Sequence, residues 1–352
     1  MILVTGATGL VGSHLLYELC RNNKKVRALY RNKSRIDKVK HVFGYYEKDS
    51  SALFSKIEWI KADILNRDDL NKAVKNCNLI YHCAAIVSFN PQKREETVQL
   101  NLQMTKNIVD AAIENSVFDF CHVSSIATLG RLGADDFVDE TAVFNHADSH
   151  SAYSIGKFKA EEYVLAAQER GLKALIIKPS VIIGPGWWQE GSGKFFSQVY
   201  KSMPYYTSGK TAFVDVRDVV QATAELVEKG IRNDTFIISA ENISYKDFFS
   251  KIATSLNKKP PYIKIPMFLS ELIWPIAELV AYVSGKEPIL NRYTARTSQK
   301  SNQFTGEKLE KRLNFKHRDI DTSIKEYGAF FLKDIREKSD FPQLLDNYKK
   351  NN

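Results

Sequence analysis

Three glycines near the amino terminus constrain the fold more than any other feature of the chain. The apolar, β-branched run at residues 2–5 predicts a strand, and a helical pattern follows from about residue 11 to residue 21. Between them lies Gly6-Ala7-Thr8-Gly9-Leu10-Val11-Gly12. Small residues in such a turn let the backbone approach a pyrophosphate, and the free N–H groups and dipole of the helix favour its charge. The turn is therefore expected to bind a dinucleotide, although a glycine triplet by itself also suits a plain tight turn. The expected contacts are Gly6, Thr8, Gly9, Leu10, Val11 and Gly12.

Strand-like and helical segments alternate after this turn. Apolar runs predict strands at residues 25–30, 57–62, 79–83, 118–123, 173–178 and 235–239. Helical patterns lie between several of them, at residues 68–74, 95–114 and 214–228. This repeated order is typical of an α/β fold with a doubly wound parallel sheet.

The residues after the second predicted strand bear on the choice of cofactor. A site for NAD usually has an Asp or Glu there, which accepts a hydrogen bond from the ribose 2′-hydroxyl. Here the chain continues Tyr30-Arg31-Asn32-Lys33-Ser34-Arg35, without an acid. Arg31 is suited to clamp a 2′-phosphate, so NADP is favoured and NAD remains the alternative. The other interpretation is a charged loop that binds nothing.

A second constellation combines a tyrosine, a lysine and a serine. Tyr153 and Lys157 lie four residues apart in an apparent helix and share one face, where a cation favours the phenolate over a phenol of pKa roughly 10. Ser124 and Ser125 follow the strand predicted at residues 118–123, and a hydroxyl there can donate to a carbonyl oxygen in the same cleft. Each feature alone is weak, since the pair can mark a solvated helix face and the serines a turn. Their order along the chain makes them informative.

In this order the motifs resemble the extended branch of the short-chain dehydrogenase/reductase superfamily, also described as the NAD-dependent epimerase/dehydratase family. Besides the glycine turn, the resemblance rests on Asp63-Ile64, His82-Cys83-Ala84-Ala85, Asn101, Ser124-Ser125, Tyr153-Ser154-Ile155-Gly156-Lys157, Lys178-Pro179-Ser180 and Phe213-Val214-Asp215-Val216-Arg217-Asp218-Val219. It implies a Rossmann fold with a smaller, mostly helical C-terminal substrate lobe.

The resemblance also implies a role for each matching residue. Ser125, Tyr153 and Lys157 would form the catalytic set, with Ser125 preferred to Ser124 because of its spacing from Gly130. Tyr153 would exchange the proton on a substrate hydroxyl or carbonyl, and Ser125 would hydrogen-bond the same oxygen. Lys157 would hold the nicotinamide ribose and lower the pKa of Tyr153. Further cofactor contacts would come from Asp63, Ile64, Ala84, Ala85, Pro179 and Ser180.

Two features favour the group that resembles dihydroflavonol reductase and 3β-hydroxysteroid dehydrogenase. Tyr30 stands where an NAD-using epimerase typically has Asp, and residues 209–213 lack the arginine with which sugar-nucleotide enzymes grip a diphosphate. Ile126 and Ala127 replace the Asp-Glu pair of the dehydratases. The expected activity is NADPH-dependent reduction of a ketone, or the reverse oxidation of a secondary alcohol, on an apolar or aromatic small molecule. The alternatives are an NAD(P)-dependent sugar-nucleotide epimerase and a non-catalytic dinucleotide-sensing scaffold.

The chain leaves the regular strand-helix order after residue 183. Aromatic residues then gather, and they suit either a ring-lined substrate pocket or core packing between lobes. They are Trp187, Trp188, Phe195, Phe196, Tyr200, Tyr205 and Tyr206. We expect residues 1–183, with 207–240 returning to them, to form the nucleotide-binding domain. Residues 184–206 and 241–340 would form the substrate lobe, and 341–352 a polar tail.

The segment at residues 267–283 is the most membrane-like in the chain. Glu271, Pro275 and Glu278 interrupt it, and it is short for a membrane span. We therefore expect a buried or surface-packed amphipathic helix, with peripheral membrane contact as the alternative.

Composition narrows the remaining classes. The 352 residues are 44% hydrophobic and 26% charged, which allows an ample core. The net charge is +9, but the lysines are spread along the chain, so no nucleic-acid partner is expected. The four cysteines have neither metal-ligand spacing nor the density of a disulfide scaffold, and no export leader is recognisable. We expect a cytoplasmic enzyme without a metal, and the family resemblance implies a homodimer.

Overall fold

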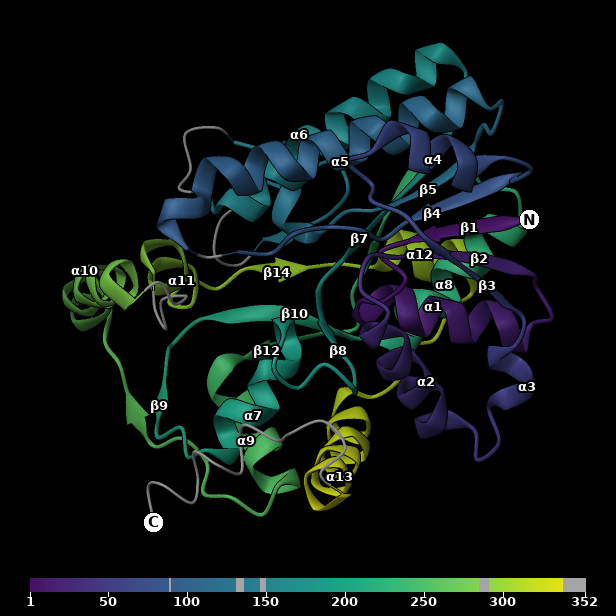
Figure 1. Ribbon diagram of the computed structural model, residues 1–352. Helices are drawn as coiled ribbons and strands as arrows, with labels where there is room; N and C mark the ends of the chain where they lie inside the picture. Colours follow the sequence, from purple (N-terminus) through teal and green to yellow (C-terminus); the bar gives the residue numbers. More distant parts are fainter. Residues whose placement is uncertain (89, 131–135, 146–149, 285–290, 338–352) are drawn as a thin grey trace.

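The computed structural model describes residues 1–352 except 89, 131–135, 146–149, 285–290 and 338–352. The polar tail predicted at residues 341–352 lies outside the described residues. At the centre is a seven-stranded parallel sheet with the strand order β11-β7-β5-β4-β1-β2-β3 (Figure 1). Its strands are β1 (Ile2–Thr5), β2 (Val26–Tyr30), β3 (Ile57–Lys61), β4 (Leu79–His82), β5 (Asp119–Val123), β7 (Lys173–Pro179) and β11 (Asp234–Ile238). The strand order reverses between β1 and β4, which confirms the predicted doubly wound sheet.

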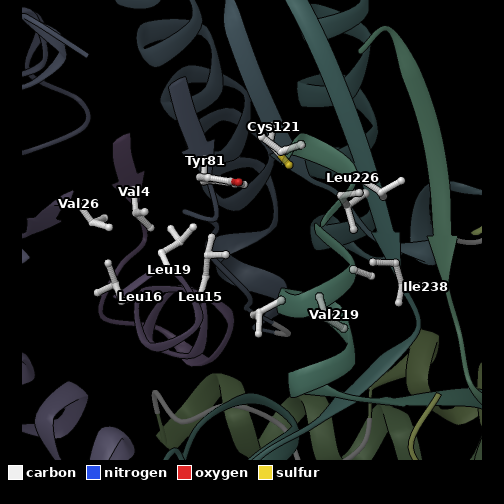
Figure 2. Close-up of a cluster of buried hydrophobic side chains, with 14 of the residues drawn as sticks. Val4, Leu15, Leu16, Leu19, Val26, Tyr81, Cys121, Val219, Leu226 and Ile238 are labelled. Atoms are coloured by element: carbon white, nitrogen blue, oxygen red, sulfur yellow. The ribbon is translucent and has the colours of Figure 1, made fainter. Parts of the chain in front are cut away.

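Helices cover both faces of this sheet, because neighbouring residues of a strand point to opposite faces. On one face Val4 packs with Leu15, Leu16 and Val219, and Figure 2 shows this cluster of buried apolar side chains. On the other face Leu3 belongs to a second buried cluster. The first face is covered by α1 (Leu10–Arg21), α8 (Val216–Glu228) and α12 (Glu307–Leu313), and the second by α4 (Arg67–Val74), α5 (Arg94–Glu114) and α6 (Ala152–Ala166).

A smaller sheet lies beside the large one, with the strand order β12-β10-β8. Its strands are β8 (Val181–Ile183), β10 (Lys210–Asp215) and β12 (Glu241–Ser244). It packs with α7 (Lys194–Tyr200), α9 (Tyr245–Ser255) and α13 (Ile320–Glu337) around a third buried cluster. Leu309 of α12 instead joins the core of the large sheet. The division of the chain into two domains stays a prediction.

The start of the helix predicted at residues 214–228 is wrong. Val214 and Asp215 end strand β10, and α8 begins only at Val216. The physical reason is a helix cap: Asp215 has extended backbone angles, and its carboxylate accepts a hydrogen bond from the Arg217 N–H.

The aromatic segment, for which pocket lining and core packing were both open, supplies core residues. Trp187, Trp188 and Phe196 are at most 4% exposed. Trp188 packs edge-on against Phe196 and Phe331, and its ring N–H donates to Asp334 Oδ2 at 2.7 Å. Of the two interpretations of these rings, core packing therefore holds for these three.

The remaining elements are short apart from two helices. They are α2 (Ser34–Tyr46), α3 (Ser51–Phe54), β6 (Phe137–Val138), β9 (Tyr205–Tyr206), β13 (Ile263–Lys264), α10 (Met267–Ser284), α11 (Arg292–Thr297) and β14 (Gln303–Phe304). Figure 1 shows α10 and α11 side by side at one end of the molecule, away from the large sheet. Among the described residues, none of the helices has both the length and the apolar character needed to cross a membrane.

Candidate active site

The glycine turn joins β1 to α1 and lies against the end of β4. Gly6 has a φ of +65°, and a Cβ on it would lie 2.5 Å from the backbone N of Ala84. A Cβ on Gly12 would lie 2.2 Å from the carbonyl oxygen of Gly6. Both positions therefore require glycine on steric grounds. Gly9 caps α1 without a side-chain hydrogen bond, so the first N–H groups of the helix remain available to an anion.

The other predicted cofactor residues of the turn lie where a ligand could reach them. Thr8, Leu10 and Val11 are partly exposed around the start of α1. Ala84 and Ala85 follow β4, with Ala84 half-buried against Gly6 and Ala85 exposed. The turn and the end of β4 thus meet at the point where the strand order reverses, which is where doubly wound sheets bind ligands.

Two more predicted pairs flank this point on either side. Asp63 is exposed after β3, and its carboxylate accepts a hydrogen bond from the Leu65 N–H at 3.0 Å. Ile64 points its side chain into the core, so any contact with a cofactor would come from its backbone, whose carbonyl oxygen already accepts a hydrogen bond from the Asn107 side chain at 3.1 Å. Pro179 ends β7, and the hydroxyl of the following Ser180 is buried without a hydrogen-bond partner among the described residues. An unpaired buried hydroxyl is costly, so a bound group is the natural partner for it.

Arg31 follows directly after β2 and is exposed. Its guanidinium makes no hydrogen bond or ion pair with any other residue that the structure describes. The nearby loop is organised by Asn32, whose side-chain oxygen accepts hydrogen bonds from the backbone N–H and the hydroxyl of Ser34. Arg31 is therefore free to bind an anion beside the carboxyl end of β2.

Local capping positions the serine and the tyrosine. Ser125 follows β5 and caps a short helix at residues 126–128, where its hydroxyl accepts from the Ala127 N–H at 3.1 Å. Ser151 caps α6 by accepting from the Ser154 N–H at 3.0 Å, which places Tyr153 in the first turn of the helix. Ser154 then donates to the Ala127 carbonyl oxygen and ties the two short segments together. The structure thereby brings Ser125 and Tyr153 within side-chain hydrogen-bond reach.

The electrostatics of Tyr153 differ from the expectation that Lys157 lowers its pKa. Burial raises the pKa of Tyr153 above its ordinary value, the hydrogen bond with Ser125 lowers it, and Tyr293 raises it. Lys157 is not among the groups that shift the pKa of Tyr153, and its ammonium donates to the Val123 carbonyl oxygen at 2.5 Å. At neutral pH Tyr153 is therefore a phenol that can donate its proton.

Lys157 is itself strongly perturbed. It is 2% exposed and lies 3.3 Å from His122 Nε2. Burial lowers the pKa of Lys157 to about 8, while Glu161 raises it. Burial and the neighbouring Lys157 also hold the pKa of His122 well below its ordinary value, so His122 is neutral and accepts the hydrogen bond.

A buried ion pair next to this site was not expected from the sequence. Glu161 Oε1 lies 2.6 Å from Lys178 Nζ, and both side chains are almost completely buried. The second carboxylate oxygen accepts from Ser124 at 2.6 Å and from Thr128 at 3.1 Å. Glu161 thus links α6, β7 and the segment after β5, the elements that carry the predicted catalytic residues. Its position one turn after Lys157 in the helix is the only sequence signal that could have revealed it.

Asn101 has a structural role that its motif did not specify. Its side-chain oxygen accepts from the Ile86 N–H at 2.9 Å, and its amide donates to the Ile86 carbonyl at 2.9 Å. The segment after β4, which carries Ala84 and Ala85, is thereby fixed to α5. Gly156 lets α6 pack closely here, since a Cβ on it would lie 3.1 Å from the Asn101 Cβ.

A cavity of about 590 Å³ lies beside the start of α6. Aromatic rings and charged groups share its lining, among them Phe144, Phe158, Trp274, Tyr293, Arg94 and Glu162. Ser125, Tyr153 and Lys157 do not line it in the described part of the chain, although Tyr293 influences the Tyr153 phenol. The cavity therefore adjoins the reactive groups without containing them.

Comparison with known proteins gives consistent results. The model of the NAD dependent epimerase/dehydratase family matches residues 2–239. A Synechocystis sp. protein whose name assigns it as a dihydroflavonol 4-reductase is 26% identical over 336 residues, which cover 93% of each chain. An Arabidopsis thaliana 3beta-hydroxysteroid-dehydrogenase/decarboxylase, isoform 1, is 27% identical over 284 residues, 74% of this chain and 63% of that protein. The Vibrio cholerae UDP-glucose 4-epimerase is 27% identical over 306 residues, 83% of this chain and 85% of that protein.

Solved structures share the fold over nearly the whole chain. The crystal structure of gox2253 superimposes with a TM-score of 0.79 and 27% identity, covering 95% of this chain and 98% of that one. The family model spans most of the chain and includes every predicted catalytic and cofactor-binding residue. The chain therefore belongs to the NAD dependent epimerase/dehydratase family and is an enzyme of this NAD-dependent kind.

Proposed function

We propose that this enzyme reduces a ketone on an apolar or aromatic small molecule with NADPH, or oxidises the corresponding secondary alcohol. The observation that carries the proposal is the placement of Ser125, directly after β5, beside Tyr153, in the first turn of α6, so close that the serine hydroxyl lowers the pKa of the phenol. Two hydroxyls so placed can hold one carbonyl oxygen between them. A nicotinamide cofactor, when bound, supplies or takes up the hydride.

The direction of proton transfer follows from the state of Tyr153. Because burial raises its pKa, Tyr153 is protonated at neutral pH and suited to give a proton to the oxygen of a ketone that is being reduced. Ser125 donates a second hydrogen bond to the same oxygen, and Lys157 lies one helical turn away on the same side of α6. At neutral pH Tyr153 therefore carries the proton that the reduction step requires.

The residues present fit a dinucleotide. The backbone cradle of Gly6 and Gly12 and the uncapped start of α1 would hold the pyrophosphate. Ala84, Ala85, Pro179 and Ser180 would border the nicotinamide half, and Asp63 and Ile64 the adenine. Arg31, with its free guanidinium, would pair with the 2′-phosphate of NADP and favour it over NAD.

A steady-state assay with a panel of ketones tests the proposal. Apolar and aromatic ketones are supplied with NADPH or NADH, and the loss of reduced cofactor is followed by its absorbance. Turnover with NADPH on at least one apolar ketone, and weaker turnover with NADH, is the expected result. If no ketone or aldehyde in the panel consumes either cofactor, the reductase proposal is overturned.

The alternative is a sugar-nucleotide epimerase, favoured by the similarity to the UDP-glucose 4-epimerase of Vibrio cholerae. Lys210, the cation nearest the position where such enzymes carry an arginine, is hydrogen-bonded to Gln303 at 3.0 Å. An epimerase interconverts UDP-glucose and UDP-galactose without net consumption of cofactor, so product analysis separates the two activities. A dinucleotide sensor would bind NADPH and show neither. We also propose a cytoplasmic location and a homodimer, which fractionation and light scattering would test.

A further inference from the structure

Helix α10 turns its apolar side outward. Its two faces differ sharply: Ser270 and Ala281 are at most 3% exposed, while most of the large apolar side chains point away from the protein. Phe268, Leu272, Ile276, Leu279, Val280 and Val283 each expose between 61 and 81% of their surface. A surface helix ordinarily shows the opposite pattern, with its apolar stripe on the core. The sequence-based expectation of a buried or surface-packed amphipathic helix is therefore corrected: the helix lies at the surface, but its apolar face is directed away from the protein.

The two acidic side chains of α10 form their contacts on the inner side of the helix. Glu271 forms a two-pronged ion pair with Arg296, with distances of 2.8 and 3.1 Å, and also accepts from the Trp274 ring N–H at 3.1 Å. Glu278 accepts from the Arg292 backbone N–H at 3.0 Å. The two acids that interrupt this segment in the sequence thus anchor the helix to α11. They leave the outer face without a charged side chain.

The apolar surface continues past the start of α10. Strand β13 pairs with β9, and Tyr205 of β9, Ile263 of β13 and Tyr262 just before β13 are between 39 and 71% exposed. This stretch is also basic. Residues 254–270 contain three lysines and no Asp or Glu, and Lys259 and Lys264 are exposed. We call this combined surface of α10, β9 and β13 the α10 surface.

We propose that the α10 surface binds peripherally to an anionic lipid membrane, with α10 lying in the interface. Large apolar side chains that are exposed together along one helix mark an interaction site. Large apolar side chains on one face and lysines at the margin are the combination with which interfacial helices bind acidic lipid. Within the described helix the outer face carries no charged group, and Tyr282 offers its one exposed ring hydroxyl, so the face is poor in the polar groups that fix the orientation of a protein partner. Binding to a lipid bilayer does not require such polar groups.

The membrane orientation has a consequence for substrate access. Trp274, Glu278, Arg292 and Tyr293 belong to α10 and α11 and line the 590 Å³ cavity beside α6. When α10 lies on a bilayer, this cavity is held next to the lipid phase, and its lining residue Tyr293 lies near Tyr153. An apolar substrate dissolved in the membrane would be presented near the reactive groups. This extension rests on the proposed function, whereas the membrane binding does not.

Co-sedimentation of the full chain with lipid vesicles tests the proposal. Vesicles of phosphatidylcholine alone and of phosphatidylcholine with 30% phosphatidylglycerol, a composition of roughly the charge found in acidic membranes, are compared for the wild type and two variants. We expect binding to the anionic vesicles and a drop of at least about tenfold for Leu272→Glu. The double variant Lys259→Glu, Lys264→Glu should lose a similar factor on anionic vesicles only, since each basic residue near an acidic surface contributes several-fold.

Leu165→Glu is the matched control. Leu165 is 43% exposed on α6, outside the α10 surface, and the same change there should leave vesicle binding unaltered. Thermal melting confirms that all variants fold. Absence of vesicle binding by the wild type, or equal binding by Leu272→Glu, overturns the proposal. A wild-type dimer that Leu272→Glu dissociates, without any vesicle binding, would assign the surface to a second copy of the chain and likewise overturn it. Ketone turnover in detergent is measured separately, so a failed proposed function is distinguished from failed membrane binding.

Discussion

Glu161→Gln removes one charge from the centre of the network that links α6, β7 and the segment after β5. The carboxylate lies 2.6 Å from Lys178 Nζ and accepts hydrogen bonds from Ser124 and Thr128. A glutamine keeps the size of the side chain and can still accept from one hydroxyl. It leaves the Lys178 ammonium, whose side chain is 7% exposed, without its counter-charge. Removing one partner of a buried ion pair costs about 3–5 kcal/mol of unfolding free energy.

The expected shift in melting temperature follows from the size of the chain. With an unfolding entropy of about 2.1 cal/mol/K per residue, a loss of about 3–5 kcal/mol in a chain of 352 residues lowers the Tm by about 4–7 °C. Glu162→Gln, at the next position of α6 and exposed, should shift it by less than about 1 °C. The double variant Glu161→Leu, Lys178→Met should recover much of the loss, because no unpaired charge remains.

Calorimetry and a pH–rate profile together test this reasoning. Since Glu161 raises the pKa of Lys157, which is about 8, its removal should lower that pKa. A kinetic limb near pH 8 should therefore move to lower pH in Glu161→Gln, an effect that a purely structural defect would not produce. Equal melting temperatures for Glu161→Gln and Glu162→Gln would refute the account of the buried pair, and an unmoved limb would refute its coupling to Lys157.

Three further outcomes are expected. Gly6→Ala puts a methyl group 2.5 Å from the backbone N of Ala84 at a φ of +65° and should lower the unfolding free energy by more than about 1 kcal/mol. Gly9→Ala, whose methyl group would lie 3.4 Å from the nearest atom, should not. Equal melting curves for the two variants would contradict this prediction. Arg31→Ala should raise the KM for NADPH at least about tenfold and leave that for NADH unchanged, and equal effects on both would exclude the phosphate contact. Burial lowers the pKa of His82 to about 3, so the unfolded chain takes up a proton below pH 6.5 that the folded chain does not. The unfolding free energy should therefore decrease as the pH is lowered, and this residue should account for a loss of about 2 kcal/mol at pH 5. Urea titrations of His82→Gln should show a shallower pH dependence than those of the wild type.

The parts of the fold that local pattern controls were predictable. A β-branched run followed by three glycines is compatible with few local structures. The strand β1, the turn and the helix α1 are found where this pattern predicts them. The predicted strands of the large sheet agree with the structure within a residue or two, because a strand covered on both faces must be apolar throughout. Ser125 and Tyr153, predicted from motif order alone, lie near enough for the serine hydroxyl to influence the pKa of the phenol, and their catalytic role stays a prediction.

Contacts between residues far apart in the chain could not be predicted from the sequence. Glu161 and Lys178 carry no pattern that marks them as partners, since the pairing depends on how α6 lies over β7. The direction of the Tyr153 pKa was also wrong, because helical spacing places Lys157 on the same face but does not say which carbonyl its ammonium binds. For α10 the sequence correctly predicted an apolar helix, but not that its apolar face would be directed away from the protein. Which face of a helix meets the protein depends on ion pairs such as Glu271 with Arg296, which form only in the fold.

The role of Tyr153 as the proton donor is tested most directly by Tyr153→Phe, which removes one hydroxyl and keeps the ring. NADPH binding, followed by the fluorescence of the reduced nicotinamide, and ketone turnover are measured side by side in the variant and the wild type. The variant should bind NADPH within about twofold of the wild type, and its turnover should fall at least about 100-fold. Turnover equal to that of the wild type would contradict the assignment.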